Sequence, residues 1–249
     1  MVDLQGRVAV VTGGGKGIGR GISACLAAAG AAVVVNYATD RTSAEQTVAG
    51  ILAKGGRAVA VAGDVGAPDG IDHLFTQAHA AFGPVDTLVN NAAVFAYAPL
   101  SDITPEEFDR HYRTNVLGVF LACRAFVAQA PGTGGSIITI ATSDITANQP
   151  GSALYTSTKG AVATLTRSLA KELGSQRIRV NAVAPGATDT EGSRGLGLIT
   201  DDNVARVAAI TPLGRLGRPD DIGPVVAFLA SADAGWVTGD VLYASGGLR

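Results

Sequence analysis

A tyrosine and a lysine stand four residues apart within residues 152–160, at Tyr155 and Lys159. If this stretch is helical, both side chains project from one face, one turn apart. A phenol has a pKa of about 10, and a neighbouring ammonium group favours the phenolate and lowers that pKa. Such a tyrosine can donate a proton to a carbonyl oxygen, or accept one from an alcohol, near neutral pH. The alternative interpretation is two unrelated residues on a helix surface.

The elements that must position this pair begin with a glycine-rich loop near the N-terminus. Residues 7–12 are apolar and largely β-branched, which predicts a buried strand, and residues 20–29 have helical character. Glycines between a strand and a helix let the backbone approach a pyrophosphate, and the helix N-terminus offers it free N–H groups. A glycine-rich turn alone is weak evidence, but this one has the right context on both sides. The predicted dinucleotide-binding residues here are Gly13, Gly15, Lys16, Gly17, Ile18 and Gly19.

The end of the second predicted strand, residues 31–36, favours NADP(H) over NAD(H). An NAD site usually has an acidic residue there to bind the ribose hydroxyls, but this chain has Asn36 and Tyr37. Lys16 and Arg41 are close enough in sequence to neutralise a 2′-phosphate. They could instead be solvated surface charges, and the nearby Asp40 leaves that choice open.

Composition excludes several other functions. The 249 residues suffice for one large domain or two small ones, and a net charge of −2 offers no basic footprint for nucleic acid. No apolar run reaches membrane-spanning length, and no signal peptide is visible. Cys25 and Cys123 lie in apolar segments and are expected to be thiols rather than a disulfide. We therefore expect a cytoplasmic protein without a metal site.

Strands and helices alternate along the chain without a hairpin signal. This pattern predicts an α/β fold, a single-domain Rossmann-type doubly wound parallel sheet of about seven strands with helices on both faces. One domain is expected over residues 1–249, with its ligands beyond the carboxyl ends of the strands. The predicted strands cover residues 7–12, 31–36, 57–62, 86–90, 136–140, 177–182 and 241–244.

Three segments between these strands carry further expectations. Thr104 and the proline and glutamates after it predict the start of a helix that runs to about Ala130 and contains Asn115. A second helix is predicted from residue 153 to about Gly174. The glycine-rich segment of about residues 187–215 is a candidate mobile lid over the substrate, or else a plain flexible loop. Asp64, after the third strand, could meet an adenine amino group or cap the next helix.

Together these residues resemble the short-chain dehydrogenase/reductase family, over essentially the whole chain. The resemblance implies hydride transfer between a nicotinamide cofactor and a carbonyl or alcohol carbon. It implies that Tyr155 is the general acid in reduction, that Lys159 holds the ribose and lowers the Tyr155 pKa, and that Asn115 supports a water-linked proton path. The motifs are Thr12-Gly-x-x-x-Gly-x-Gly19, Asp64-Val65, Asn90-Asn-Ala-Ala93, Asn115, Tyr155-x-x-x-Lys159 and Pro185-Gly186. Residues implied along the cofactor include Asp64, Val65, Asn90, Asn91, Ala92, Pro185, Gly186, Thr188 and Thr190.

The hydroxyl that would bind the substrate oxygen is ambiguous. The family usually has a serine thirteen residues before the tyrosine, which is the position of Thr142, while Ser143 lies one residue nearer. Register favours Thr142 and residue type favours Ser143, and we favour Ser143 while naming both.

The leading hypothesis is an NADPH-dependent ketoreductase. The resemblance is to enzymes that reduce bulky apolar or polycyclic aromatic, polyketide-type ketones in secondary metabolism such as antibiotic biosynthesis. One alternative is a 3-oxoacyl-[acyl-carrier-protein] reductase, for which Arg110, Arg113 and Arg124 would supply a basic patch. Another is a catalytically silent NADP-binding regulator, although the intact Tyr155 and Lys159 pair disfavours it. The family also implies a homotetramer that pairs helices at about 105–130 and 153–173.

Overall fold

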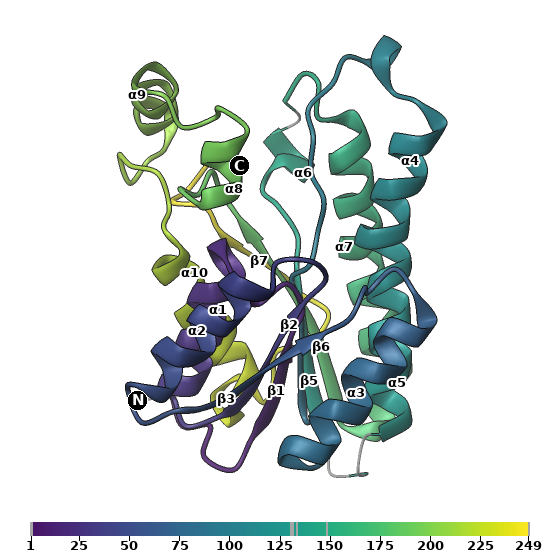
Figure 1. The fold of residues 1–249 in the computed structure, drawn as a ribbon. Helices are drawn as coiled ribbons and strands as arrows, with labels where there is room; N and C mark the ends of the chain where they lie inside the picture. Colours follow the sequence, from purple (N-terminus) through teal and green to yellow (C-terminus); the bar gives the residue numbers. More distant parts are fainter. Residues whose placement is uncertain (1, 130–131, 133, 148, 249) are drawn as a thin grey trace.

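The computed structural model describes residues 2–129, 132, 134–147 and 149–248, and it contains one seven-stranded sheet (Figure 1). Every pairing between neighbouring strands is parallel, in the order β3-β2-β1-β4-β5-β6-β7. The order reverses between β1 and β4, which creates the crevice where such sheets bind ligands. The strands are β1 Val8–Val11, β2 Ala32–Tyr37, β3 Arg57–Ala62, β4 Thr87–Asn90, β5 Gly135–Ile140, β6 Ile178–Pro185 and β7 Val241–Ala244. The predicted fold class is confirmed.

Helices cover both faces of the sheet (Figure 1). One face is covered by α1 Gly17–Ala28, α2 Arg41–Leu52 and α10 Pro219–Ala230. The other face is covered by α3 Pro68–Phe82, α4 Pro105–Tyr112, α5 Gly118–Gln129 and α7 Ala153–Leu173. Three further helices lie beyond the carboxyl ends of the strands, namely α6 Asp144–Ala147, α8 Glu191–Gly195 and α9 Asp201–Ile210.

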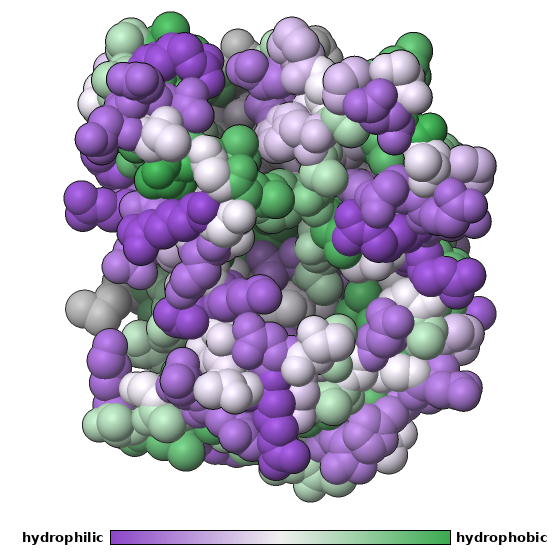
Figure 2. Space-filling view, turned by 45° about the horizontal axis from the view of Figure 1, so that its top comes forward, coloured by the Kyte–Doolittle hydropathy of each residue, from purple (hydrophilic) through white to green (hydrophobic). Residues whose placement is uncertain are grey.

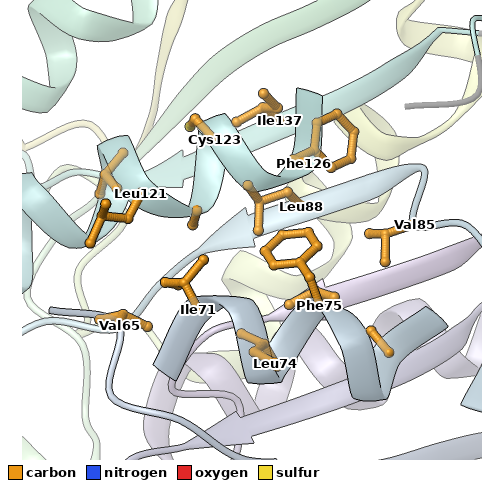
Figure 3. Packing of buried hydrophobic residues seen from close by; sticks show 14 of the residues in the cluster. Val65, Ile71, Leu74, Phe75, Val85, Leu88, Leu121, Cys123, Phe126 and Ile137 are labelled. Carbon is orange, nitrogen blue, oxygen red and sulfur yellow. The ribbon is translucent and has the colours of Figure 1, made fainter. Parts of the chain in front are cut away.

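The two helical layers are held by side chains that alternate across the sheet. In β1, Val8 and Val10 pack toward α3, α5 and α7, while Ala9 and Val11 pack toward α1 and α10. Figure 3 shows part of the first core, where Phe75 and Phe126 pack against Leu88, and all three are nearly inaccessible to solvent. Burying each such side chain stabilises the fold by about 1.5–3 kcal/mol. Strands buried on both faces therefore read as continuous apolar runs.

The helix predicted over about 105–130 is present in the structure and contains a π turn. It begins where expected, because the Thr104 side chain accepts a hydrogen bond from the Glu107 amide. A π-helical segment, Arg113–Leu117, joins α4 to α5 without a break and contains Asn115, so one helical run is confirmed, with a π turn that the sequence did not indicate. The expected end at Ala130 lies outside the described residues. Single π turns within helices occur frequently at functional sites.

Other differences from the predicted elements are smaller. Strand β6 continues to Pro185, past the predicted end at residue 182, because Val183 and Ala184 are fully buried and pair with β7. The segment of residues 187–215 is not a plain loop, since it contains α8 and α9. Both cysteines are free thiols, as expected. None of the described helices is long and apolar enough to cross a membrane.

Candidate active site

Helix α7 places Tyr155 and Lys159 on one face, beside the carboxyl end of β5. The Lys159 ammonium group is buried and donates a hydrogen bond of 2.7 Å to the carbonyl oxygen of Ile140, the last residue of that strand. Its nitrogen lies 5.8 Å from the centroid of the Tyr155 ring. Tyr155 itself is only partly buried. The spacing of four residues therefore brings the phenol and the ammonium group together at a strand end.

Burial controls the protonation of this pair. It raises the pKa of Tyr155 above its usual range, and the nearby Tyr97 and Asp144 raise it further. Burial also lowers the pKa of Lys159 to about 8. The prediction that Lys159 lowers the pKa of Tyr155 is wrong for this arrangement, because desolvation of the phenol dominates. A phenol that keeps its proton at neutral pH suits a general acid.

The structure distinguishes the two candidate hydroxyl groups near Tyr155. The Thr142 hydroxyl lies near enough to the Tyr155 hydroxyl to oppose the rise in the phenol's pKa. Ser143 is only 2% exposed, and its amide group is bonded to the Pro185 carbonyl. Of the two, Thr142, the position indicated by register, is the one whose side chain acts on the phenol.

Asn115 joins the loop after β4 to α7. Its side-chain oxygen accepts a hydrogen bond from the Val94 amide, and its side-chain nitrogen donates to the Val94 carbonyl, each at 2.8 Å. The same nitrogen donates to the Thr158 hydroxyl at 3.0 Å. The π turn brings this buried amide between the two segments, so Asn115 fixes one side of the site.

The glycine loop is held in shape by contacts with the end of β4. Gly13 has a φ of +59°, and a side chain there would place a Cβ 3.0 Å from the Cα of Ala92. The Thr12 hydroxyl accepts hydrogen bonds from the amides of Asn91 and Ala92, both at 3.0 Å. The Asn91 side chain donates to the carbonyls of Thr12 and Gly13. The crevice between β1 and β4 is thus lined by preformed backbone.

The N-terminus of α1 already holds an anionic group. The Glu191 carboxylate accepts a hydrogen bond of 3.0 Å from the Gly17 amide, and it forms an ion pair of 2.8 Å with Arg20. Desolvation raises the pKa of Glu191, but backbone hydrogen bonds and the charge of Arg20 outweigh it, so the pKa is lowered. This carboxylate stands in for a phosphate at a helix N-terminus, where amide groups and the helix dipole favour negative charge. Ile18 and Gly19 complete this first turn.

The residues expected near the adenosine ribose behave differently from one another. Asn36 is 1% exposed, accepts a hydrogen bond from the Gly13 amide at 3.3 Å and donates to the Gly63 carbonyl at 2.9 Å. It therefore holds the glycine loop in place through its hydrogen bond with Gly13. Lys16 lies 3.6 Å from Asp40 and remains half exposed, while Arg41 pairs with Glu45 at 2.7 Å. Tyr37 is the last residue of β2, next to these charges.

Two predicted residues, Asp64 and Val65, follow β3, and a third, Asn90, is the last residue of β4. The Asp64 carboxylate accepts a hydrogen bond from the Gly66 amide at 2.9 Å. Helix α3 has Ala67 at its N-cap and no side-chain cap, so the alternative that Asp64 caps this helix is wrong. Val65 is buried in the core, and Asn90 is buried within reach of the Thr139 hydroxyl at 3.5 Å.

The remaining predicted residues follow β6, on the opposite side of the crevice. Pro185 ends that strand, and the Thr188 hydroxyl donates to the Gly186 carbonyl at 2.8 Å. The Thr190 hydroxyl caps α8 by accepting a hydrogen bond from the Ser193 amide at 3.1 Å. The β-carbon that Gly17 lacks would lie 3.4 Å from Thr190, so this turn contacts the glycine loop.

Sequence reasoning missed the acidic residues of the site. Asp144 accepts a hydrogen bond from the Tyr97 hydroxyl at 3.1 Å, and both influence Tyr155. The Phe95 ring lies 6.0 Å from the Tyr155 ring. Figure 2 shows apolar residues around a hollow on this face of the molecule. In the sequence, Asp144 and Glu191 could have been found from their positions directly after the predicted site residues Ser143 and Thr190.

Among the described residues, no group of three or more His, Cys, Asp or Glu side chains lies together as a metal site.

A doubly wound parallel sheet with a tyrosine and lysine beside a dinucleotide crevice defines a Rossmann-type oxidoreductase. A family model described as enoyl-(acyl carrier protein) reductase matches residues 13–249. An uncharacterised oxidoreductase of Methylorubrum extorquens is 48% identical over the full length of both chains. Versicolorin reductase 1 of Aspergillus parasiticus is 40% identical, over 98% of this chain and 97% of that protein. The chain belongs to the short-chain dehydrogenase/reductase family, so the predicted family and enzyme class are confirmed.

Solved structures agree with this assignment. The reductase LugOII, described as catalysing keto-reduction at C1 during lugdunomycin biosynthesis, has a TM-score of 0.92 and 37% identity, over 98% of both chains. A blue fluorescent protein from a metagenomic library, solved in complex with NADPH, has a TM-score of 0.91 and 36% identity, over 99% of both chains.

Proposed function

We propose that this protein is an NADPH-dependent ketoreductase acting on polyketide-type, polycyclic aromatic ketones in secondary metabolism. The observation that carries the proposal is the position of Tyr155 at the end of β5, with the Lys159 nitrogen 5.8 Å from its ring centroid. NADPH, when bound, supplies the hydride to the carbonyl carbon. The similarity to versicolorin reductase 1 and to LugOII, described as catalysing keto-reduction during lugdunomycin biosynthesis, supports the substrate class.

Each residue of the site has a distinct part in this proposal. Tyr155 donates its proton to the carbonyl oxygen, and Thr142 orients that oxygen through its hydroxyl group. Lys159, fixed by the Ile140 carbonyl, has two further hydrogens for the ribose hydroxyls of the cofactor. Asn115 keeps the loop after β4 in place beside α7. A protonated phenol favours reduction over oxidation at neutral pH.

The cofactor fits the residues that surround the crevice. The amide groups at the N-terminus of α1, where Glu191 now provides the anion, would hold the pyrophosphate. Lys16, half exposed and only weakly paired, and Arg41 would neutralise the 2′-phosphate. Asn91 and Thr188 would lie along the nicotinamide half. The relative solved with NADPH supports the choice of this cofactor.

Oxidation of NADPH in the presence of a panel of ketones tests this function. We expect turnover of bulky aromatic ketones, and we expect Tyr155→Phe to abolish it while NADPH affinity stays nearly intact. Tyr112→Phe, whose hydroxyl contacts only Ser157 among the described residues, is the matched control and should keep activity. NADPH binding without turnover of any ketone by the unaltered protein would instead indicate a silent regulator.

A second candidate, an acyl-carrier-protein-linked reductase, is favoured by the description of the matching family model. It requires a basic patch for the acidic carrier, and Arg110 is already paired with Glu107 at 2.8 Å. This pairing weakens the patch. Good turnover of acyl thioesters with poor turnover of aromatic ketones would decide for this candidate.

The segment of residues 187–215 is proposed to act as a substrate lid. Helix α8 within it contacts the first turn of α1 through Glu191, so a shift of this helix would open both the cofactor site and the substrate site.

We also propose a cytoplasmic homotetramer that pairs α4–α5 and α7. Exposed Phe108, Leu117 and Phe120 on those helices support an interface there, and light scattering in solution tests it.

A further inference from the structure

A carboxylate that the proposed reaction does not use lies beside Tyr155. Asp144 is the first residue of α6, and its amide group donates a hydrogen bond of 3.3 Å to the Thr142 hydroxyl. Thr142 in turn contacts the Tyr155 hydroxyl. The same turn of chain therefore holds the substrate-orienting hydroxyl and this acidic group.

A second segment meets Asp144 at the same place. Tyr97, in the loop after β4, donates its hydroxyl hydrogen to Asp144 at 3.1 Å. The neighbouring Ala98 amide donates to the Gly151 carbonyl at 2.9 Å, which fixes this loop beside the start of α7. Two segments that are far apart in sequence thus place a phenol and a carboxylate next to the reacting tyrosine.

This carboxylate has unused capacity to accept hydrogen bonds. An ionised carboxylate offers about four acceptor positions. Within the described part of the chain, Tyr97 is the one side chain that donates to Asp144, and no lysine or arginine offsets its charge. Burial raises the pKa of Asp144 above its usual value. A half-buried acceptor of this kind is expected to bind a further donor.

The walls next to this acceptor are flat and apolar. The Phe95 ring is tilted by 52° against the Tyr155 ring, with their centroids 6.0 Å apart. Gly192 of α8 faces Phe95, and a Cβ at that position would lie 3.5 Å from the ring. Gly192 therefore lies close to the Phe95 ring, and α8 forms a further wall of this region.

We propose that Asp144 and Tyr97 form a substrate subsite that binds a phenolic hydroxyl group, so that the substrates are flat ketones that also carry such a hydroxyl. Asp144 accepts the hydroxyl hydrogen, and Tyr97 fixes the carboxylate. This subsite rests on the proposed ketoreductase function and narrows its substrate class. The carboxylate repels acidic ketones and offers nothing to the alkyl chain of an acyl thioester.

The test compares α-tetralone with a series of monohydroxylated tetralones, using NADPH as the reductant. For each protein variant the measured quantity is the ratio of kcat/KM for the best hydroxylated ketone to that for the unsubstituted one. This ratio cancels any change in Tyr155 that affects both ketones. In the unaltered protein we expect a ratio of about ten or more, as for one hydrogen bond to a charged acceptor.

Three variants then test whether the Asp144 carboxylate causes the preference for hydroxylated ketones. Asp144→Ala should bring the ratio to about one, and Asp144→Asn, which keeps one acceptor oxygen, should give an intermediate value. Asp72→Ala, an exposed carboxylate on α3, is the matched control and should keep the original ratio. A carboxylated tetralone should be a poor substrate that improves in Asp144→Asn, because the repelling charge is gone. Circular dichroism and NADPH binding verify folding, and Asp144→Asn decides if the alanine variant does not fold.

Two results would overturn the subsite without touching the ketoreductase function. One is an unaltered protein that reduces α-tetralone and the hydroxylated tetralones equally well. The other is a ratio that Asp144→Ala leaves unchanged, which would make the Tyr97 contact a purely structural one. If the unaltered protein reduces no ketone at all, the proposed function fails and the subsite fails with it.

Discussion

The carboxylate of Glu191 accepts a hydrogen bond from the amide group of Gly17, with its Oε2 3.0 Å from the amide nitrogen, although the two residues are 174 positions apart. Its other oxygen lies 2.8 Å from Arg20. Helix α8 is thereby attached to the first turn of α1, where an anionic ligand is favoured. A cofactor phosphate at this helix end would meet the same amide groups and the same arginine. Glu191 is therefore expected to compete with the phosphate or to repel it.

Replacing this carboxylate should strengthen NADPH binding. We expect Glu191→Gln to lower the Kd for NADPH about twofold to fivefold, since charge interactions at a helix N-terminus contribute about 0.3–1 kcal/mol. Titration by NADPH fluorescence measures it, and the difference should shrink at high salt. Glu172→Gln, an exposed glutamate on α7, is the control. Weaker binding in Glu191→Gln would mean that this carboxylate belongs to the cofactor-bound site.

The hydroxyl next to Tyr155 should matter more than its neighbour in sequence. We expect Thr142→Ala to lower kcat by about 10²-fold, because it removes the group that orients the carbonyl oxygen. Thr142→Ser should retain most of the activity, since it keeps the hydroxyl group. Ser143→Ala should have a much smaller effect on kcat, because Ser143 is buried and is bonded through its backbone. Steady-state kinetics with one aromatic ketone measures all three, and the reverse order would return the role to Ser143.

The choice between cofactors should depend on Lys16. Removing its charge with Lys16→Ala should lower kcat/KM for NADPH by about tenfold and change that for NADH little, because only NADPH carries the 2′-phosphate. The ratio of kcat/KM for the two cofactors is the measurement. Lys54→Ala, a lysine near the C-terminal end of α2, serves as the control. An unaltered protein that prefers NADH would refute the assignment of both Lys16 and Arg41.

The pH dependence of the reverse reaction should report on Asp144. Alcohol oxidation needs the Tyr155 phenolate as a base, so its rate rises as pH passes through the Tyr155 pKa. Burial raises this pKa first, and the charges of Tyr97 and Asp144 raise it further, while the contact with Thr142 lowers it. Asp144→Asn removes one negative charge, so the pKa should fall and the rising limb should move to lower pH. A limb that stays in place or moves to higher pH would show that Asp144 does not act on the phenol.

The sequence by itself determined the parts of this protein that depend on local periodicity. The four-residue spacing of Tyr155 and Lys159 places both on one face of any helix, and α7 shows this arrangement. The apolar runs predicted a parallel sheet because strands covered on both faces are apolar throughout. Thr12 and the glycines between β1 and α1 indicated the crevice for the same local reason.

Tertiary structure decided the contacts between residues far apart in sequence. Two hydrogen bonds, between Glu191 and Gly17 and between Tyr97 and Asp144, join segments whose approach depends on the whole sheet. Neither pair produces a periodic pattern in the sequence. The choice of Thr142 over Ser143 depends on which side chain faces α7 at the end of β5. The direction of the Tyr155 pKa shift was predicted wrongly, because the sequence shows the neighbouring lysine but not the desolvation of the phenol or the nearby Tyr97 and Asp144, which raise this pKa.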